Sequence, residues 1–160
     1  MYYILNNVKT YKANLEVIFY SNKNQTSYKI KQEVLENKSV QEILSPENIC
    51  GIKIELEGNK LKISNTKLKL EKIYEDYDAI LNNSLFLNVF ISDYKKNSSR
   101  SYVSEDEIIL ETKIENSINT YAKYKELHID KKSKRISGLI IKDNNKKTRI
   151  NIKYSDIEIK

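Results

Sequence analysis

Apolar and polar residues alternate with a period of two along most of this sequence. Residues 11–20 show the pattern best, because Tyr11, Ala13, Leu15, Val17 and Phe19 are separated mostly by polar residues. Successive side chains of a β-strand point to opposite faces, so the pattern predicts a strand with one buried face. Since the same period returns in segment after segment, the chain is constrained to fold mainly as antiparallel β-sheet.

Short polar turns separate the alternating segments, so consecutive strands are expected to form hairpins. The turn signals include residues 21–25, 57–59 and 143–145, and Pro46 is expected to stop a strand. The expected strands cover residues 11–20, 28–34, 39–44, 51–56, 61–63, 68–70, 108–114, 121–129, 136–142, 149–154 and 157–159. This pattern predicts nine to eleven strands, with residues 73–80 irregular.

Two segments have helical spacing instead. Leu85, Phe86, Val89, Phe90 and Tyr94 follow one another at i, i+1, i+4, i+5 and i+9, which predicts a helix of about ten to twelve residues. Phe86, Val89 and Phe90 are expected to share its apolar face. The spacing of apolar residues within 1–10 predicts a short amphipathic N-terminal helix. The candidate N-caps of the mid-chain helix are Asn82, Asn83 and Ser84, and residues 95–99 are expected to end that helix.

These elements predict a mainly β (α+β) fold. Many consecutive hairpins form a strongly twisted sheet that curls. Its concave face is too apolar to stay open, and the two helices are the elements available to cover it. We therefore expect a curved antiparallel half-barrel of about nine to eleven strands with both helices on its concave face. Without a linker or a composition shift, residues 1–160 are expected to form a single domain.

Composition removes several classes of site. The 160 residues include one cysteine, one histidine and three glycines. An internal disulfide, a multi-cysteine metal site and a glycine-rich phosphate loop are therefore excluded. No Gly-x-Ser-x-Gly or zinc motif is present. The sequence predicts no catalytic residue, no metal and no cofactor, and hence a protein that is not an enzyme.

The residues with intrinsic reactivity favour structural roles. His128 has the chemistry of a general base or metal ligand, but its sequence neighbours are expected on the other face of the strand. Cys50 would need a base, and only His128 is available. Buried structural roles are therefore favoured for both.

Acidic and aromatic residues are abundant without forming a recognisable site. The groups Glu75/Asp76/Asp78 and Glu105/Asp106/Glu107 lack calcium-loop spacing and are interpreted as solvated loops. The 12 tyrosines would suit the lining of an apolar or glycan ligand site, or a core. The core interpretation is favoured, because several of them occupy inward strand positions.

The net charge is +6, and all but three of the 28 basic residues are lysine. A nucleic-acid site usually combines arginine with stacking aromatic residues, whereas these lysines are spread among acidic residues. The densest basic run, residues 131–135, is interpreted as a solvated loop between two strands. No nucleic-acid partner is therefore expected.

The order of elements resembles a known family, the LolA/LolB-type lipoprotein carriers, in its form from endospore-forming bacteria. The resemblance extends over nearly the whole chain. The segments that carry it are Thr10-Tyr11-Lys12-Ala13, Val17-Ile18-Phe19-Tyr20-Ser21-Asn22-Lys23, Tyr28-Lys29-Ile30-Lys31-Gln32, Leu44-Ser45-Pro46-Glu47-Asn48, Gly51-Ile52-Lys53-Ile54, Gly58-Asn59, Leu127-His128-Ile129-Asp130, Gly138-Leu139-Ile140-Ile141-Lys142-Asp143 and Ile152-Lys153-Tyr154.

The resemblance implies a non-catalytic, exported spore-germination lipoprotein on the cortex side of the developing spore. It also implies a partner, a zinc-dependent N-acetylmuramoyl-L-alanine amidase of the CwlD type. Together such proteins enable muramic-lactam modification of cortex peptidoglycan, and hence cortex lysis at germination. A signal peptide and a lipidated cysteine that anchors the protein to the membrane are implied too. We expect neither within residues 1–160, because Cys50 is internal.

Two further expectations concern binding. The wider fold suggests an alternative function, the carriage of a lipid or lipoprotein in an apolar cavity. Edge strands suit pairing with a partner, and the hairpins of residues 136–159 are candidates for exchange between two copies in a homodimer. Arg149 is the candidate partner-binding residue, because arginine is enriched at interface anchors. A plain surface charge is the alternative for Arg149.

Overall fold

The computed structural model describes residues 6, 8–75, 86–114 and 122–160. The expected caps Asn82, Asn83 and Ser84 and nearly all of the expected N-terminal helix lie outside these residues. The described elements are β1 (Tyr11–Tyr20), β2 (Gln25–Val34), β3 (Lys38–Ser45), the 3₁₀ helix η1 (Glu47–Ile49), β4 (Ile52–Glu57), β5 (Lys60–Asn65), β6 (Leu70–Tyr74), α2 (Leu87–Lys96), β7 (Ser99–Val103), β8 (Glu107–Lys113), β9 (Tyr124–Asp130), β10 (Ile136–Lys142) and β11 (Thr148–Ile159).

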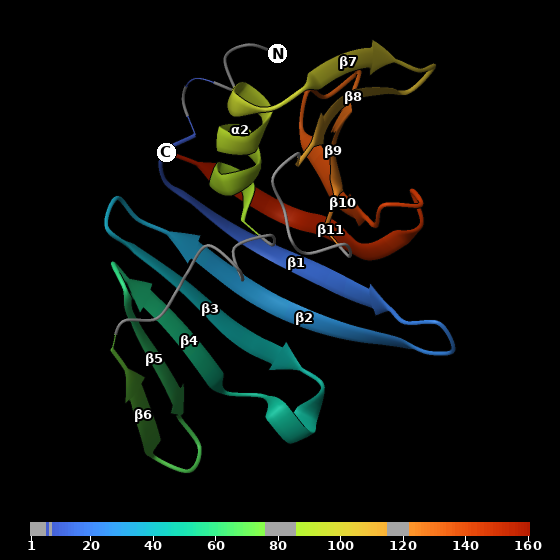
Figure 1. Cartoon of the computed structure of the whole chain (residues 1–160). Helices are drawn as coiled ribbons and strands as arrows, with labels where there is room; N and C mark the ends of the chain where they lie inside the picture. Colours follow the sequence, from blue (N-terminus) through green and yellow to red (C-terminus); the bar gives the residue numbers. More distant parts are fainter. Residues whose placement is uncertain (1–5, 7, 76–85, 115–121) are drawn as a thin grey trace.

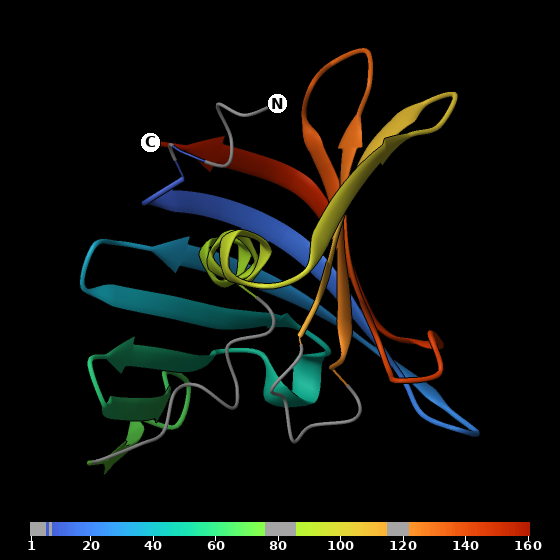
Figure 2. The same ribbon diagram turned by 45° about the horizontal axis from the view of Figure 1, so that its top comes forward.

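The strands form one antiparallel sheet of eleven strands, in the order β6-β5-β4-β3-β2-β1-β11-β10-β9-β8-β7. Strands β1–β6 form one meander and β7–β11 a second. The meanders meet where β1 pairs with β11, from Tyr11 opposite Ile159 to Phe19 opposite Ile150. Figures 1 and 2 show the sheet curling around α2. The expected mainly β half-barrel with a mid-chain helix is confirmed.

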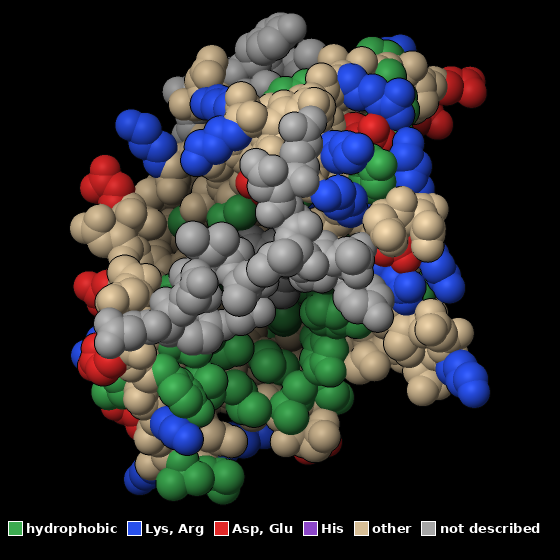
Figure 3. Space-filling view, in the orientation of Figure 1, with side chains coloured by type: hydrophobic (Ala, Val, Ile, Leu, Met, Phe, Trp, Pro, Cys, Tyr) green, Lys and Arg blue, Asp and Glu red, His purple; other side chains and the backbone are tan. Residues whose placement is uncertain are grey.

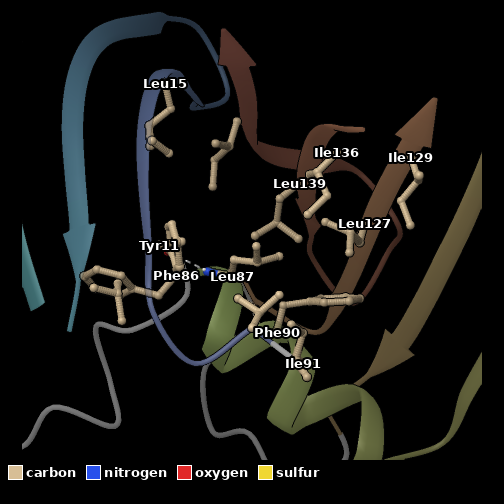
Figure 4. Packing of buried hydrophobic residues seen from close by; sticks show 14 of the residues in the cluster. Tyr11, Leu15, Phe86, Leu87, Phe90, Ile91, Leu127, Ile129, Ile136 and Leu139 are labelled. Carbon is tan, nitrogen blue, oxygen red and sulfur yellow. Dashed lines mark hydrogen bonds between the residues drawn. The ribbon is translucent and has the colours of Figure 1, made fainter. Parts of the chain in front are cut away.

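The core lies between α2 and the strands on either side of the β1–β11 pair. Leu87, Phe90 and Ile91 follow one another at i, i+3 and i+4, so they share the buried face of the helix. They belong to one buried cluster with inward residues such as Leu15 and Leu127 (Figure 4). Phe90 is fully buried, and burial of a side chain of this size stabilises a fold by about 1.5–3 kcal/mol.

The start of α2 differs from the expectation. Phe86 is the N-cap residue and supplies no side-chain hydrogen bond. The hydroxyl of Tyr11 serves instead, because it accepts a hydrogen bond of 3.0 Å from the N–H of Leu87. Val89, expected to be a buried knob, is only partly buried at the margin of the core, and Leu87 and Ile91 are buried in its place.

Tyr11 also joins the helix to a buried polar chain. Its hydroxyl donates a hydrogen bond to Oε1 of Gln32, and Nε2 of Gln32 donates to Oε1 of Gln41 at 3.3 Å. Burial raises the pKa of Tyr11. The hydroxyl therefore keeps its proton, and it can donate to Gln32 while it accepts from Leu87.

The far end of α2 is held by an ion pair. Nζ of Lys125 on β9 lies 2.8 Å from Oδ2 of Asp93, and the Lys125 side chain is only 6% exposed. The hydroxyl of Thr112 on β8 donates to the backbone oxygen of Asp93 at 3.3 Å. Lys95 and Lys96 follow in the last turn, where positive charge complements the helix dipole. The helix is thus tied at both ends to the sheet that it covers.

Three strand predictions need correction. Residues 99–103 form β7, which the sequence pattern missed because all five residues are exposed and burial does not alternate. Residues 149–154 and 157–159 belong to one strand, β11, whose alternation is interrupted by a bulge at Ser155, between the pairs Asn14/Asp156 and Leu15/Tyr154. Strand β6 occupies Leu70–Tyr74, so the expected irregular region at 73–80 is wrong at its start.

We expect Tyr11→Phe to lower the free energy of unfolding by about 1–3 kcal/mol, because the buried Leu87 N–H and Gln32 amide both lose their partner. Tyr28→Phe is the matched control, since Tyr28 packs edge-on against Phe19 with ring centroids 5.6 Å apart and keeps that contact as phenylalanine. Urea unfolding of both variants measures the difference. Equal stability of the two variants would contradict this role of Tyr11.

Candidate functional site

Arg149 lies at the start of β11, beside the turn between β10 and β11. Its Nε donates a hydrogen bond of 2.8 Å to Oδ2 of Asp143, and its side chain is 16% exposed. Asp143 also accepts hydrogen bonds from the N–H groups of Lys147 and Asn145, each at 2.9 Å. These bonds, the Lys147 N–H first, hold the pKa of Asp143 below its usual range.

The guanidinium also reaches a second turn. Nη1 of Arg149 lies 3.4 Å from Oδ1 of Asn22, in the turn between β1 and β2. Arg149 therefore links two turns at one end of the sheet, and its side chain is held in place by the fold. This arrangement is compatible with an interface anchor, because a pre-ordered side chain loses little entropy on binding.

A charged cluster lies on the convex face of β8–β10, made of Glu107, Glu126, His128 and Lys142. Nδ1 of His128 lies 3.0 Å from Oε2 of Glu107, and Nε2 lies 3.2 Å from Oε1 of Glu126. Nζ of Lys142 donates to Oε2 of Glu126 at 2.5 Å. Glu126 is buried, so its negative charge needs compensation by its neighbours His128 and Lys142.

The pKa values in the charged cluster follow from these contacts. Hydrogen bonding to His128 and then Lys142 lowers the pKa of Glu126 to about 2, although burial alone would raise it. The bond to Glu126, followed by the one to Glu107, raises the pKa of His128 above its usual 6.5. The two carboxylates therefore favour the protonated form of His128, which lies between them. With both ring nitrogens engaged, it has no free nitrogen to accept a proton or bind a metal.

A cross-strand carboxylate pair extends this network toward β7. Glu111 of β8 is directly opposite Glu126 of β9, an arrangement of like charges that destabilises a sheet unless cations compensate. Arg100 compensates Glu111, because its Nε lies 2.8 Å from Oε1 of Glu111. The opposed carboxylates of Glu111 and Glu126 are therefore each compensated by basic side chains of this chain.

The concave side of the first meander has an apolar surface over β4–β6, called here the open apolar face. Most inward residues of β4–β6 are apolar, with Asn65 and Lys72 as the polar exceptions. Only Leu61 among the apolar ones is buried, and none of them belongs to the core cluster under α2. Figure 3 shows hydrophobic side chains gathered where Figure 1 places β3, β4 and β5. The residues of the open apolar face are Ile52, Ile54, Leu56, Leu61, Ile63, Leu70 and Tyr74.

Cys50 and His128 lie far apart. Cys50 is half-buried after η1, between β3 and β4, whereas His128 is on β9. Strands β3 and β9 are five strand spacings apart in the sheet, about 24 Å. Both ring nitrogens of His128 contact Glu107 and Glu126, so the structure does not pair Cys50 with His128.

The other candidate residues have mixed outcomes. Glu105 and Asp106 lie in the exposed β7–β8 turn, but Glu107 belongs to the charged cluster, so its interpretation as a solvated loop residue is wrong. Asp76 and Asp78 lie outside the described residues, and Glu75 is exposed. Residues 131–135 form the expected exposed loop. Tyr11 is buried in the core, and Tyr28 packs against the core cluster, as the core interpretation predicted.

The sequence reasoning missed Glu126 and Glu107 as partners of His128. Glu126 precedes His128 by two residues, so both side chains lie on one face of β9. That i, i+2 spacing was a usable signal. Glu107 depends on the β8–β9 register, in which Ile109 lies opposite His128, and no local pattern reveals that register.

Two kinds of feature are absent from the described residues. No three or more histidine, cysteine, aspartate or glutamate side chains within them lie close enough together to hold a metal ion. None of the helices in the described part of the chain is long and apolar enough to cross a membrane.

No protein-family model matches this sequence, and no curated protein matches it. Solved structures do. The structure of the CwlD amidase from Clostridioides difficile in complex with the GerS lipoprotein matches with a TM-score of 0.63 and 23% identity, over 95% of this chain and 87% of the matched chain. This chain has the fold of GerS.

Two further matches are more distant than GerS. An uncharacterized conserved protein from Thermus thermophilus matches with a TM-score of 0.57 and 11% identity, over 99% of this chain and 82% of the other. The LolA superfamily protein NE2245 from Nitrosomonas europaea matches with a TM-score of 0.46 and 13% identity, over 95% and 86%. The expected fold is confirmed by the eleven-stranded curved sheet and by the likeness to GerS. At these identities the likeness to GerS establishes the fold alone.

The charged cluster makes stability depend on pH. Because the pKa of Glu126 falls to about 2 on folding, its contribution is present above the unfolded value of 4.5 and is lost as pH falls toward 2. Because the pKa of His128 is raised, its contribution is present below the unfolded value of 6.5 and is lost as pH rises through the folded value. The cluster therefore contributes most between pH 4.5 and 6.5.

We expect Glu126→Gln to cost about 1–3 kcal/mol of unfolding free energy in that window and less on either side of it. Glu33→Gln is the control, since Glu33 forms an exposed ion pair with Lys12 at 3.5 Å and should contribute under about 1 kcal/mol. Urea unfolding at pH values below, within and above the window measures both. A cost for Glu126→Gln that does not change with pH would contradict the assignment.

Proposed function

We propose that this protein is a non-catalytic, exported partner of an N-acetylmuramoyl-L-alanine amidase of the CwlD type. In this role it supports muramic-lactam modification of spore cortex peptidoglycan and, through it, cortex lysis at germination. The observation that carries the proposal is the likeness to GerS, a lipoprotein in complex with CwlD, over 95% of this chain. The proposal includes a membrane tether through a lipidated cysteine other than the internal Cys50.

The chemistry of the described residues supports a binding role. The ring nitrogens of His128 contact Glu107 and Glu126, and five strand spacings of the sheet separate β9, which carries His128, from β3, which precedes Cys50. Exposed strand edges and the open apolar face, in contrast, are surfaces that another molecule can cover.

Light scattering on a size-exclusion column tests the partnership. We expect this chain and a CwlD-type amidase to co-elute with a defined stoichiometry, and the amidase to cleave cortex peptidoglycan faster in the complex. An unrelated protein of the same size and net charge is the control, because it separates specific binding from electrostatic attraction. Separate elution together with unchanged amidase activity would refute the proposal.

We also propose that Arg149 contacts the amidase. Arg149→Glu should then weaken the complex at least tenfold, about 1.4 kcal/mol, because it reverses a charge at the interface. Asp143→Asn is the matched control: it weakens the same ion pair but leaves the guanidinium in place. Calorimetric titration measures both affinities. Equal losses in the two variants would mean that Arg149 acts only by holding the turn.

The open apolar face favours a second candidate function, carriage of a lipid or lipoprotein. Ile54→Glu should then abolish lipid binding, because it places a charge at the centre of the apolar surface. Val40→Lys is the control and should bind normally, because it adds a charge on the opposite face of the neighbouring strand, between Glu33 and Glu55. Organic extraction and mass spectrometry of protein purified from its natural host measure bound lipid. Protein free of lipid would reject this function.

A further inference from the structure

Strand β6 forms one end of the sheet, so among the described elements it has a strand neighbour on one side only, β5 (Figure 1). All five of its residues are exposed. We propose that β6 receives an extended peptide segment of a different protein, which adds to the sheet as one further antiparallel strand. The segment carries an acidic residue flanked by apolar residues. This inference does not depend on the proposed amidase partnership.

The register of the meander shows which backbone groups of β6 face outward. The two-residue turn between β4 and β5 makes Glu57 and Lys60 a hydrogen-bonded pair. Bonding alternates along an antiparallel ladder, so the even-numbered residues of β6 bond to β5. Glu71 and Ile73 therefore direct their N–H and C=O groups away from the sheet, where an added strand can pair with them.

The β6 edge is apolar on both faces of the sheet. Leu70 is 62% exposed on the concave face, which it shares with the exposed ring of Tyr74, and Ile73 is 44% exposed on the convex face. The pairing of β5 with β6 is regular, without a bulge that would twist the edge away. Edge strands usually carry proline, a bulge or inward charges that block pairing. Lys72 is the inward charge of this edge, and it limits which strand can pair there.

Lys72 sets the charge of the residue that lies opposite it. It is the only charged residue among the inward residues of β4–β6. Its Nζ lies 5.0 Å from the centroid of the Tyr74 ring, and no described carboxylate forms an ion pair with it. In an added strand the opposite residue occupies a non-hydrogen-bonded position, where Cα atoms are about 4.5 Å apart. Like charges destabilise such a pair and opposite charges stabilise it, so an acidic residue is favoured.

The other positions of the segment follow from the same register. Apolar residues opposite Leu70 and Tyr74 would cover these exposed side chains on the concave face, and an apolar residue opposite Ile73 would do so on the convex face. Glu71 is already paired with Lys62, whose Nζ lies 3.3 Å from its Oε2, so an uncharged polar residue suffices there. From the residue opposite Tyr74 to the one opposite Leu70, the segment is apolar, apolar, acidic, polar and apolar.

A second copy of β6 does not meet this requirement. A two-fold axis at Lys72 places Lys72 opposite Lys72 of the other copy. An axis at Glu71 opposes the two Glu71 carboxylates, and an axis at Ile73 opposes Glu71 and Glu75. Each symmetric register centred on residues 71–73 therefore opposes like charges. The net charge of +6 also favours an acidic segment from another protein.

Fluorescence anisotropy of a labelled peptide added to the full chain tests the proposal. The peptide contains leucine, valine, glutamate, serine and leucine in that order, and a second peptide carries lysine in place of the glutamate. We expect saturable binding of the glutamate peptide and at least tenfold weaker binding of the lysine peptide. Lys72→Glu should reverse this preference, because it exchanges the charges of one cross-strand pair. Attraction to the net charge of the whole chain would not produce a reversal.

A proline variant tests the backbone contacts. Ile73→Pro removes an outward N–H and leaves the bonds to β5 intact, so it should weaken binding of the glutamate peptide at least tenfold. Ser101→Pro is the matched control at the other edge of the sheet and should leave the affinity unchanged. Because the Lys113 N–H donates to the Ser98 oxygen, the odd-numbered residues of β7 face outward there. The charge reversal in Lys72→Glu keeps the proposal testable if Ile73→Pro misfolds.

Three results would each overturn the proposal. The first is the absence of saturable binding of the glutamate peptide at millimolar concentration. The second is a Lys72→Glu variant that still prefers the glutamate peptide. The third is equal weakening by Ile73→Pro and Ile54→Glu. Since Ile54 is on β4, two strands from the edge, that result would mean that the peptide binds the open apolar face as an apolar ligand and not as a strand.

Discussion

The pairing of the first and last strands, β1 and β11, is the interaction on which the rest of the structure depends. It joins residues about 140 positions apart, so its formation carries a large loop-closure entropy cost. The inward side chains on both strands, among them Val17 and Ile152, are fully buried and offset that cost. With this pair formed, two local meanders become one sheet, and Tyr11 reaches the start of α2. The core under the helix therefore exists only when the chain ends meet.

Among the described elements one α-helix, α2, packs on the eleven-stranded sheet, and this explains the distribution of burial. α2 covers the concave face near β1 and β8–β11, where inward side chains are almost completely buried. On β4 and β5 inward residues such as Ile54 and Ile63 remain half-buried, although their sequence pattern is as apolar as that of the core strands. The alternation sets which face is apolar, and the position of α2 decides which part of that face becomes core.

The sequence predicted strands well wherever one face is buried, because burial on one side is what produces alternation. It missed β7, whose five residues are all exposed, and it split β11 at the bulge near Ser155. The start of α2 was unpredictable locally, since its cap is the hydroxyl of Tyr11, a residue 76 positions away. At the candidate site the spacing of Glu126 and His128 was readable, whereas Glu107 and the Arg149–Asp143 pair depend on strand register and on turn geometry.

The buried charged side chains of the described residues compensate one another. This favours recognition of a partner through surface shape and backbone hydrogen bonds. These buried charges are satisfied within the chain: Lys125 by Asp93, Glu126 by His128 and Lys142, and Asp143 by Arg149. Charges that compensate one another are poor candidates for chemistry on a substrate, because a reacting group must change its protonation or its partners. The groups that still gain by contact are the outward backbone of the edge strands and the open apolar side chains of β4–β6. Both are stabilised by another strand or by an apolar molecule, which is why this fold suits a binding protein.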